Sequence, residues 1–221
     1  MATRYRWLRI NTELKIAEIK ARMAAARFSV DVDDGFSFID SDIRGEIRYY
    51  WRTVVTTSYI DHDNSQVYQA VPTLAMLDFS LVDGRTTSYI RLKNPPRTMS
   101  AFLNALERII GFGFSVENFN VLLHGREELL KRSDSARLVS VKATNVKLAD
   151  NVIGRVEAVS KDYISNDLLG KFSMYPHLVD FCTYELIHKN VRGQVSFYRN
   201  GQARVSENIG GYVLNLVEGV L

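Results

Sequence analysis

Residues 73–93, TLAMLDFSLVDGRTTSYIRLK, alternate apolar and polar side chains on both sides of an Asp-Gly pair. Such alternation is typical of strands with one buried face, and Asp-Gly is a favoured two-residue turn. The sequence therefore predicts a β-hairpin that turns at Asp83-Gly84. Opposed residues share a face, so one face is apolar and the other presents Tyr89, Arg91 and Lys93 to solvent. A shift of one residue would bury Arg91, and this register is therefore well specified.

A second stretch, residues 46–60, is rich in aromatic and β-branched residues and predicts a long strand. One of its faces is apolar, and the other places Tyr50 between Arg48 and Arg52. We expect the buried faces of both stretches to pack under two helices with 3.6-residue periodicity. The residues expected in this core are Ile16, Ile19, Tyr49, Trp51, Leu77, Phe79, Ile90, Leu92, Phe102 and Leu106.

The order of expected elements predicts an α+β fold, in which an antiparallel sheet built from hairpins has helices packed on one face. Strand, helix, several strands and helix follow one another, and this order returns from about residue 152. We therefore expect a first α+β half at 1–111, a connecting segment at 112–151 and a second half at 152–221, or one continuous domain. This possible duplication resembles, in topology alone, the saddle of the TATA-binding-protein-like folds.

The segment GQVSFYRNGQARVS is another expected hairpin, and its register is open. A two-residue turn at Asn200-Gly201 would place Phe197 opposite Arg204 and build a platform of aromatic and arginine side chains. A three-residue turn with Gly201 in the left-handed bulge position would place Phe197 opposite Ala203. The second register gathers the apolar residues on one face, so the pattern favours it. It directs Tyr198 and Arg204 outward.

Composition narrows the classes of protein without selecting a function. The 221 residues carry a net charge of +3, with 19 arginines against 9 lysines. Arginine offers a planar fork for phosphates and stacks on rings, although genomic base composition explains the same bias. A single cysteine, Cys182, forms no disulfide within the chain. No signal peptide or membrane-spanning stretch is evident, so we expect a cytoplasmic protein without membrane contact.

The sequence contains none of the common catalytic motifs. It therefore predicts no catalytic residue, metal or cofactor. His62 lies between two aspartates in DHDN, a pattern that a polar turn explains as well as a metal site. A nuclease would need clustered carboxylates for Mg²⁺. The candidates are Asp31, Asp33, Asp34, Asp40, Asp42 and Glu46, which lie around an expected hairpin at Asp34-Gly35. No lysine follows them in the arrangement that such nucleases use.

The leading hypothesis is a non-catalytic nucleic-acid-binding subunit that acts with a catalytic protein partner. Bases would stack on tyrosines of the sheet face while cations on either side bind phosphates. The residues expected in this site are Arg48, Tyr50, Arg52, Tyr89, Arg91, Lys93, Tyr198 and Arg204. The alternatives are a protein-interaction or scaffold subunit, since interfaces favour the same residue types, and a metal-dependent nuclease. DNA and RNA, as single strands or as duplexes, are all candidate ligands of this site.

Overall fold

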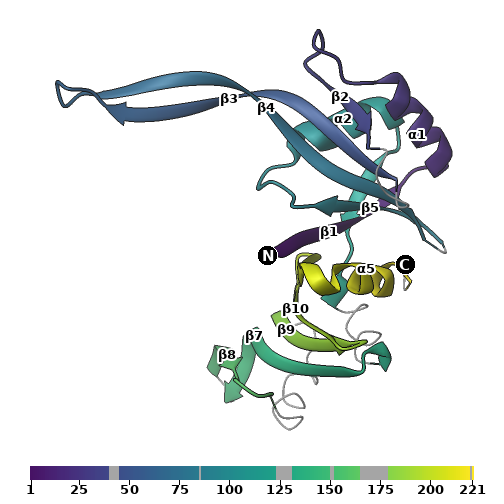
Figure 1. The fold of residues 1–221 in the computed structure, drawn as a ribbon, viewed down its shortest axis with the longest axis vertical. Coiled ribbons are helices and arrows are strands. Elements are labelled where there is room, and N and C mark those ends of the chain that lie inside the picture. Colours follow the sequence, from purple (N-terminus) through teal and green to yellow (C-terminus); the bar gives the residue numbers. More distant parts are fainter. Residues whose placement is uncertain (40–44, 85, 123–130, 150–151, 165–178, 220) are drawn as a thin grey trace. The chain divides into compact units, whose positions relative to one another are not determined.

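The computed structural model describes residues 1–221 except 40–44, 85, 123–130, 150–151, 165–178 and 220 (Figure 1). The described residues form an α+β fold, as expected from the sequence, with eleven strands in antiparallel pairings and three α-helices. The chain divides into two compact units whose segments interleave along the sequence. The first unit contains Met1–Asn11, Val82–Asn94 and Val116–Leu221, and the second contains Thr12–Leu81 and Pro95–Ser115.

The first unit is a sheet with the strand order β5-β1-β11-β10-β9-β7-β8, and β6 also pairs with β1. Its strands are β1 (Ala2–Asn11), β5 (Ser88–Lys93), β6 (Ser115–Asn118), β7 (Ser135–Ala149), β8 (Val152–Val159), β9 (Val179–His188), β10 (Val191–Tyr198) and β11 (Gln202–Ser206). A 3₁₀ turn, Glu207–Ile209, leads into α5 (Gly210–Glu218). Buried residues of α5, including Val213 and Leu216, join the apolar side chains of one sheet face in a single core. We call this the inner face of the sheet.

The β10–β11 hairpin adopts the register that binary patterning favours. Phe197 pairs with Ala203, and Val195 pairs with Val205. The turn is closed by the amide of Gly201, which donates to the carbonyl of Tyr198, and Gly201 has a φ of 79°. A Cβ on Gly201 would lie 2.5 Å from the carbonyl oxygen of Phe119, so both the backbone angle and the space require glycine.

The second unit contains α1 (Ile16–Ala25), β2 (Asp34–Phe38), β3 (Glu46–Ile60), most of β4 (Gln66–Asp83) and α2 (Ser100–Ile110). Its core confirms the expected packing of strands under helices. The ring of Phe102 in α2 lies 4.9 Å from that of Phe79 and 5.7 Å from that of Tyr49. Leu77, Ile19 and Leu106 are also buried. Two expected core residues, Ile16 and Trp51, are only half-buried.

Two turns differ from their predicted positions. The amide of Gly84 donates to the carbonyl of Thr87, so the loop after β4 is longer than the predicted two-residue turn. Asp34-Gly35 does not turn a hairpin, because it begins β2, which pairs with β3. Gly35 is needed there for close packing, since its Cβ would lie 2.6 Å from the backbone of Phe28.

The expected duplication stays a prediction. The helix expected near 164–175, which would complete the second repeat, falls largely outside the described residues. None of the helices within the described part of the chain is long and apolar enough to cross a membrane.

Candidate nucleic-acid interface

In the second unit, the predicted residues of β3 are held by contacts within the protein. The guanidinium of Arg48 donates through Nε to Oδ1 of Asp78, at 2.5 Å, and through Nη2 to Oδ2, at 3.0 Å. The hydrogen bond from Arg48 to Asp78 raises the pKa of this guanidinium further above its ordinary value, and a hydrogen bond to Tyr50 raises it to a smaller extent. The ring of Tyr50 stacks on Phe28, with centroids 4.7 Å apart.

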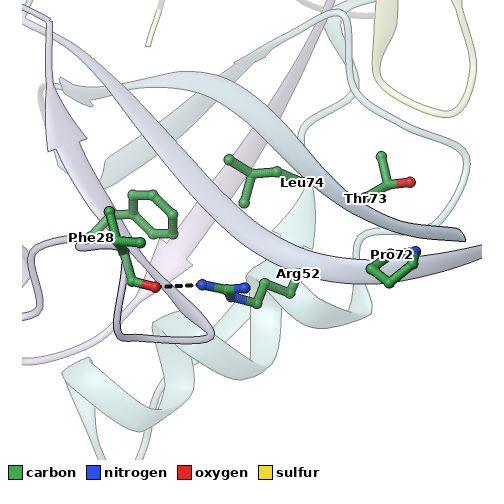
Figure 2. Close-up of a pocket in the computed structure, with 6 residues that line it drawn as sticks. Phe28, Arg52, Pro72, Thr73 and Leu74 are labelled. Atoms are coloured by element: carbon green, nitrogen blue, oxygen red, sulfur yellow. Dashed lines mark hydrogen bonds between the residues drawn. The ribbon is translucent and has the colours of Figure 1, made fainter.

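Arg52 also has partners within this unit. It donates to the carbonyl oxygen of Val30 and more weakly to that of Val32. Figure 2 shows Arg52 among the labelled residues Phe28 and Leu74. Its side chain borders a hollow of about 290 Å³ whose lining is mostly apolar. The lining residues are Phe28, Val30, Arg52, Pro72, Thr73 and Leu74. The guanidinium of Arg52 therefore supports the chain before β2, and it does so beside an apolar surface.

In the first unit, β5 contradicts the prediction that Tyr89 and Arg91 face solvent. Tyr89 is 3% exposed, and its ring packs edge-on against Phe119 at 5.3 Å. Arg91 is 6% exposed and forms an ion pair with Glu218 of α5. Lys93, at the end of the strand, is half-buried. The prediction was wrong because it assumed that only one face of this strand is covered, whereas both faces are.

The opposite face of the first unit's sheet carries the other two predicted residues. Along β11, β10 and β9, side chains alternate between the buried inner face and a second face, which we call the outer face. Tyr198 is half-buried and Arg204 is exposed. Both belong to the outer face, because Phe197, Ala203 and Val205 beside them are buried in the inner one.

An aromatic pair lies on the outer face. Tyr198 of β10 is directly opposite Phe181 of β9, and their rings stack with centroids 5.7 Å apart and planes 28° apart. Phe181 is in turn opposite Lys142 of β7, whose Nζ lies 6.0 Å from the ring centroid. A half-buried aromatic pair with a cation over one of its two rings is an arrangement on which a base can stack.

A row of cations and hydroxyl groups runs across the strands beside this aromatic pair. Arg4 of β1 is opposite Arg204 of β11, and Arg204 is opposite Ser196 of β10. The hydroxyl of Ser196 lies 2.8 Å from that of Thr183, the next residue in the row. Like charges directly opposite each other are destabilising. Among the residues that the structure describes, neither Arg4 nor Arg204 forms an ion pair with a carboxylate.

Further cations extend this face, some of them already engaged. Arg6 is opposite Gln202 and donates through Nη2 to Oδ1 of Asn118 at 2.6 Å. Arg192 forms an ion pair with Glu185 at 2.6 Å. Sequence patterning selected Tyr198 and Arg204, but it missed Phe181, Lys142 and Arg4. Only the pairings of β9 with β10, of β7 with β9 and of β1 with β11 bring them together.

The acidic residues suggested for a nuclease do not gather in the described part of the chain. Asp34 accepts from Arg108, with Oδ2 at 2.7 Å from Nη2, and from the Tyr49 hydroxyl at 2.7 Å. The side chain of Asp33 is almost fully exposed, and Asp40 and Asp42 lie outside the described residues. No group of three or more potential metal ligands is found among the residues searched, which are the described ones.

Comparison with known proteins places the chain in no family. No family model matches the chain, and no curated protein matches it. Among solved structures, a likeness is found to DynU16, described as a protein of the dynemicin biosynthetic locus. The two chains are 8% identical, and the match covers 98% of this chain and 93% of the other with a TM-score of 0.20. A likeness of this size supports no conclusion about fold or function.

Proposed function

We propose that this protein is a nucleic-acid-binding subunit that holds single strands on the outer face of its first unit. The observation that carries the proposal is the stacked pair Tyr198–Phe181 beside the opposed arginines Arg4 and Arg204. Bases stack on aromatic side chains of an exposed sheet, and arginines on neighbouring strands bind the phosphates between them. This is the function expected from the sequence, but the binding site lies on the outer face and not on β3 and β5.

The charge arrangement favours an anionic ligand. Cβ atoms directly opposite each other in antiparallel strands are about 4.5–5.5 Å apart, so the positive charges of Arg4 and Arg204 repel each other. A phosphate between the two guanidinium groups would turn this repulsion into two charge-assisted hydrogen-bonding contacts. One of the hydroxyl groups of Ser196 and Thr183 donates to the other, so this pair offers one additional donor along the same row.

The aromatic arrangement favours single strands over duplexes. In a duplex the bases are already stacked on each other, and their flat faces are not available to Tyr198 or Phe181. A single strand offers every base face, and each base that stacks on an aromatic side chain contributes about 1–3 kcal/mol. Lys142, whose Nζ lies over the Phe181 ring, can neutralise the next phosphate.

The test is a set of fluorescence anisotropy titrations with labelled oligo-dT, oligo-U and a DNA duplex. We expect Tyr198→Ala to weaken single-strand binding by about 1–3 kcal/mol, the value of one stacked base. Tyr50→Ala is the matched control, because Tyr50 is a half-buried tyrosine of the second unit that stacks on Phe28. It should leave the affinity unchanged.

Each outcome has a clear meaning. Loss of binding in Tyr50→Ala but not in Tyr198→Ala would place the site on β3, with Arg48 and Arg52, and would contradict the outer-face proposal. Absence of binding by the unmodified protein to all three probes would contradict nucleic-acid binding itself. Thermal melts of both variants test whether a loss of binding comes from unfolding.

A further inference from the structure

The far halves of β3 and β4 form a two-stranded ribbon, which we call the arm: Thr53–Ile60 paired with Gln66–Thr73. Figure 1 shows this ribbon continuing well past β2, α1 and α2 of the same unit. Every arm residue except Thr53 and Val67 is exposed. The exposed side chains include large apolar ones, such as Val54 at 61% and Ile60 at 73%. A two-stranded ribbon exposed on both faces is marginally stable by itself.

The outer edge of β3 has hydrogen-bonding groups that point away from β4. The amide of Arg52 donates to the carbonyl of Asp33, on the side of β3 opposite to β4. Backbone direction alternates along a strand, and the β3–β4 register runs without a bulge from Glu46 to Ile60. The N–H and C=O groups of Val54, Thr56, Ser58 and Ile60 therefore point outward. Within the described residues, no strand pairs with this edge.

The chemistry of this edge differs from that of a protected edge. Exposed edge strands are commonly blocked by lysines, other charges or proline. On β4, Pro72 lies opposite Val54, where its nitrogen faces away from β3 and offers no donor. The β3 side has no proline, and the whole arm contains no Lys, Arg, Asp or Glu. The nearest charges flank the arm: Arg52 at its base, held by the carbonyl oxygen of Val30, and Asp61 at its tip.

The sequence of the edge is also chemically symmetric. Residues 54–60 read VVTTSYI, which is apolar at both ends and hydroxyl-bearing in the centre. If this strand meets a copy of itself antiparallel, with Thr57 at the two-fold axis, similar residues oppose each other. The pairs are Val54 with Ile60, Val55 with Tyr59, Thr56 with Ser58, and Thr57 with Thr57. An aromatic residue opposite a β-branched one, and one hydroxyl-bearing residue opposite another, are favourable cross-strand pairs.

We propose that the arm is a homodimerisation element in which the β3 edges of two copies pair antiparallel about Thr57. This register uses the whole open stretch between Arg52, whose amide is already bonded, and the acidic tip. It satisfies every outward N–H and C=O from Val54 to Ile60 and joins two ribbons into one four-stranded sheet. A two-fold contact of identical patches is the commonest form of protein self-association. The proposal does not depend on nucleic-acid binding.

The test is the mass of the full chain in solution, measured by light scattering over a concentration series. The unmodified protein should reach twice the 25.2 kDa of one chain. Thr57→Lys and Thr57→Glu each place like charges opposite each other at the axis, so each variant alone should be monomeric. An equimolar mixture of the two should recover the dimer, because the charges then attract.

Two control variants separate the edge from the rest of the arm. Gln69→Lys adds a charge on the same ribbon face, on the residue of β4 opposite Thr57, and should leave the dimer intact. Thr56→Pro removes an outward donor of β3 and should dissociate the dimer, whereas Ala70→Pro, on the outer edge of β4, should not. A monomer at every concentration would overturn the proposal. So would a dimer that persists in folded Thr57→Lys and Thr56→Pro.

Discussion

Replacing Arg91 by methionine should destabilise the protein severely, although its position in an alternating strand suggests a surface residue. The Arg91 side chain is 7% exposed, and that of its partner Glu218 is 19% exposed. Removing one member of a buried ion pair leaves the other charge without compensation, which costs about 3–5 kcal/mol. Because the Glu218 carboxylate retains some contact with water, we expect a cost near the lower end, about 3 kcal/mol.

The assay is urea denaturation followed by circular dichroism. A loss of about 3 kcal/mol lowers the unfolding midpoint by roughly 1–3 M for a slope of about 1–3 kcal/mol per M. The double variant Arg91→Met with Glu218→Leu removes both charges and should recover most of the stability, since apolar replacements of buried pairs are often neutral or stabilising. A cost within about 0.5 kcal/mol for Arg91→Met, the range of ordinary surface changes, would refute the buried pair.

Three other predictions concern stability. In folded protein, burial raises the pKa of Asp34, but hydrogen bonds from Arg108 and Tyr49 outweigh it and lower that pKa below its usual value. A lowered pKa gives stability that is present above the unfolded pKa and lost as the pH falls through the folded one. The Tm advantage of the unmodified protein over Asp34→Asn should therefore shrink in acid, and an advantage that grows would contradict this. Gly201→Ala should cost about 1–3 kcal/mol in urea denaturation because of its positive φ and the close carbonyl of Phe119. Leu77→Ala should lower the free energy of unfolding by about 2–5 kcal/mol in the same assay. A loss of less than about 1 kcal/mol would indicate that Leu77 is not in the core.

The sequence predicts best where one face of a strand is buried. In the β10–β11 hairpin, alternation selected the observed register because only one choice gathers Val195, Phe197, Ala203 and Val205 on one face. The same logic places Leu77 and Phe79 in the core. In both cases local pattern and tertiary burial require the same arrangement.

The sequence predicts poorly where both faces of a strand are covered. Tyr89 and Arg91 alternate with apolar residues, yet they are buried too, because Phe119 and Glu218 cover them from the other side. Glu218 is 127 residues from Arg91 in the chain, and no local pattern reports a partner at that distance. A buried arginine with a distant carboxylate has the same sequence pattern as a solvated one.

The candidate site could be predicted only in part for a related reason. Tyr198 and Arg204 follow from hairpin alternation, which is a local property. Phe181, Lys142 and Arg4 join them through strand pairings that depend on the order of strands in the sheet. The arm is another case, because alternation carries no information where both faces of the ribbon are exposed.

The most direct test of the outer-face interface is the salt dependence of single-strand binding. Each phosphate contact contributes a slope of about −0.7 to the dependence of log affinity on log salt for single strands. If Arg4 and Arg204 each bind a phosphate, the double variant Arg4→Ala with Arg204→Ala should flatten the slope by roughly 1.4. Arg97→Ala, which removes an exposed arginine of the second unit, should leave it unchanged. A folded double variant with the slope of the unmodified protein would contradict the proposed interface.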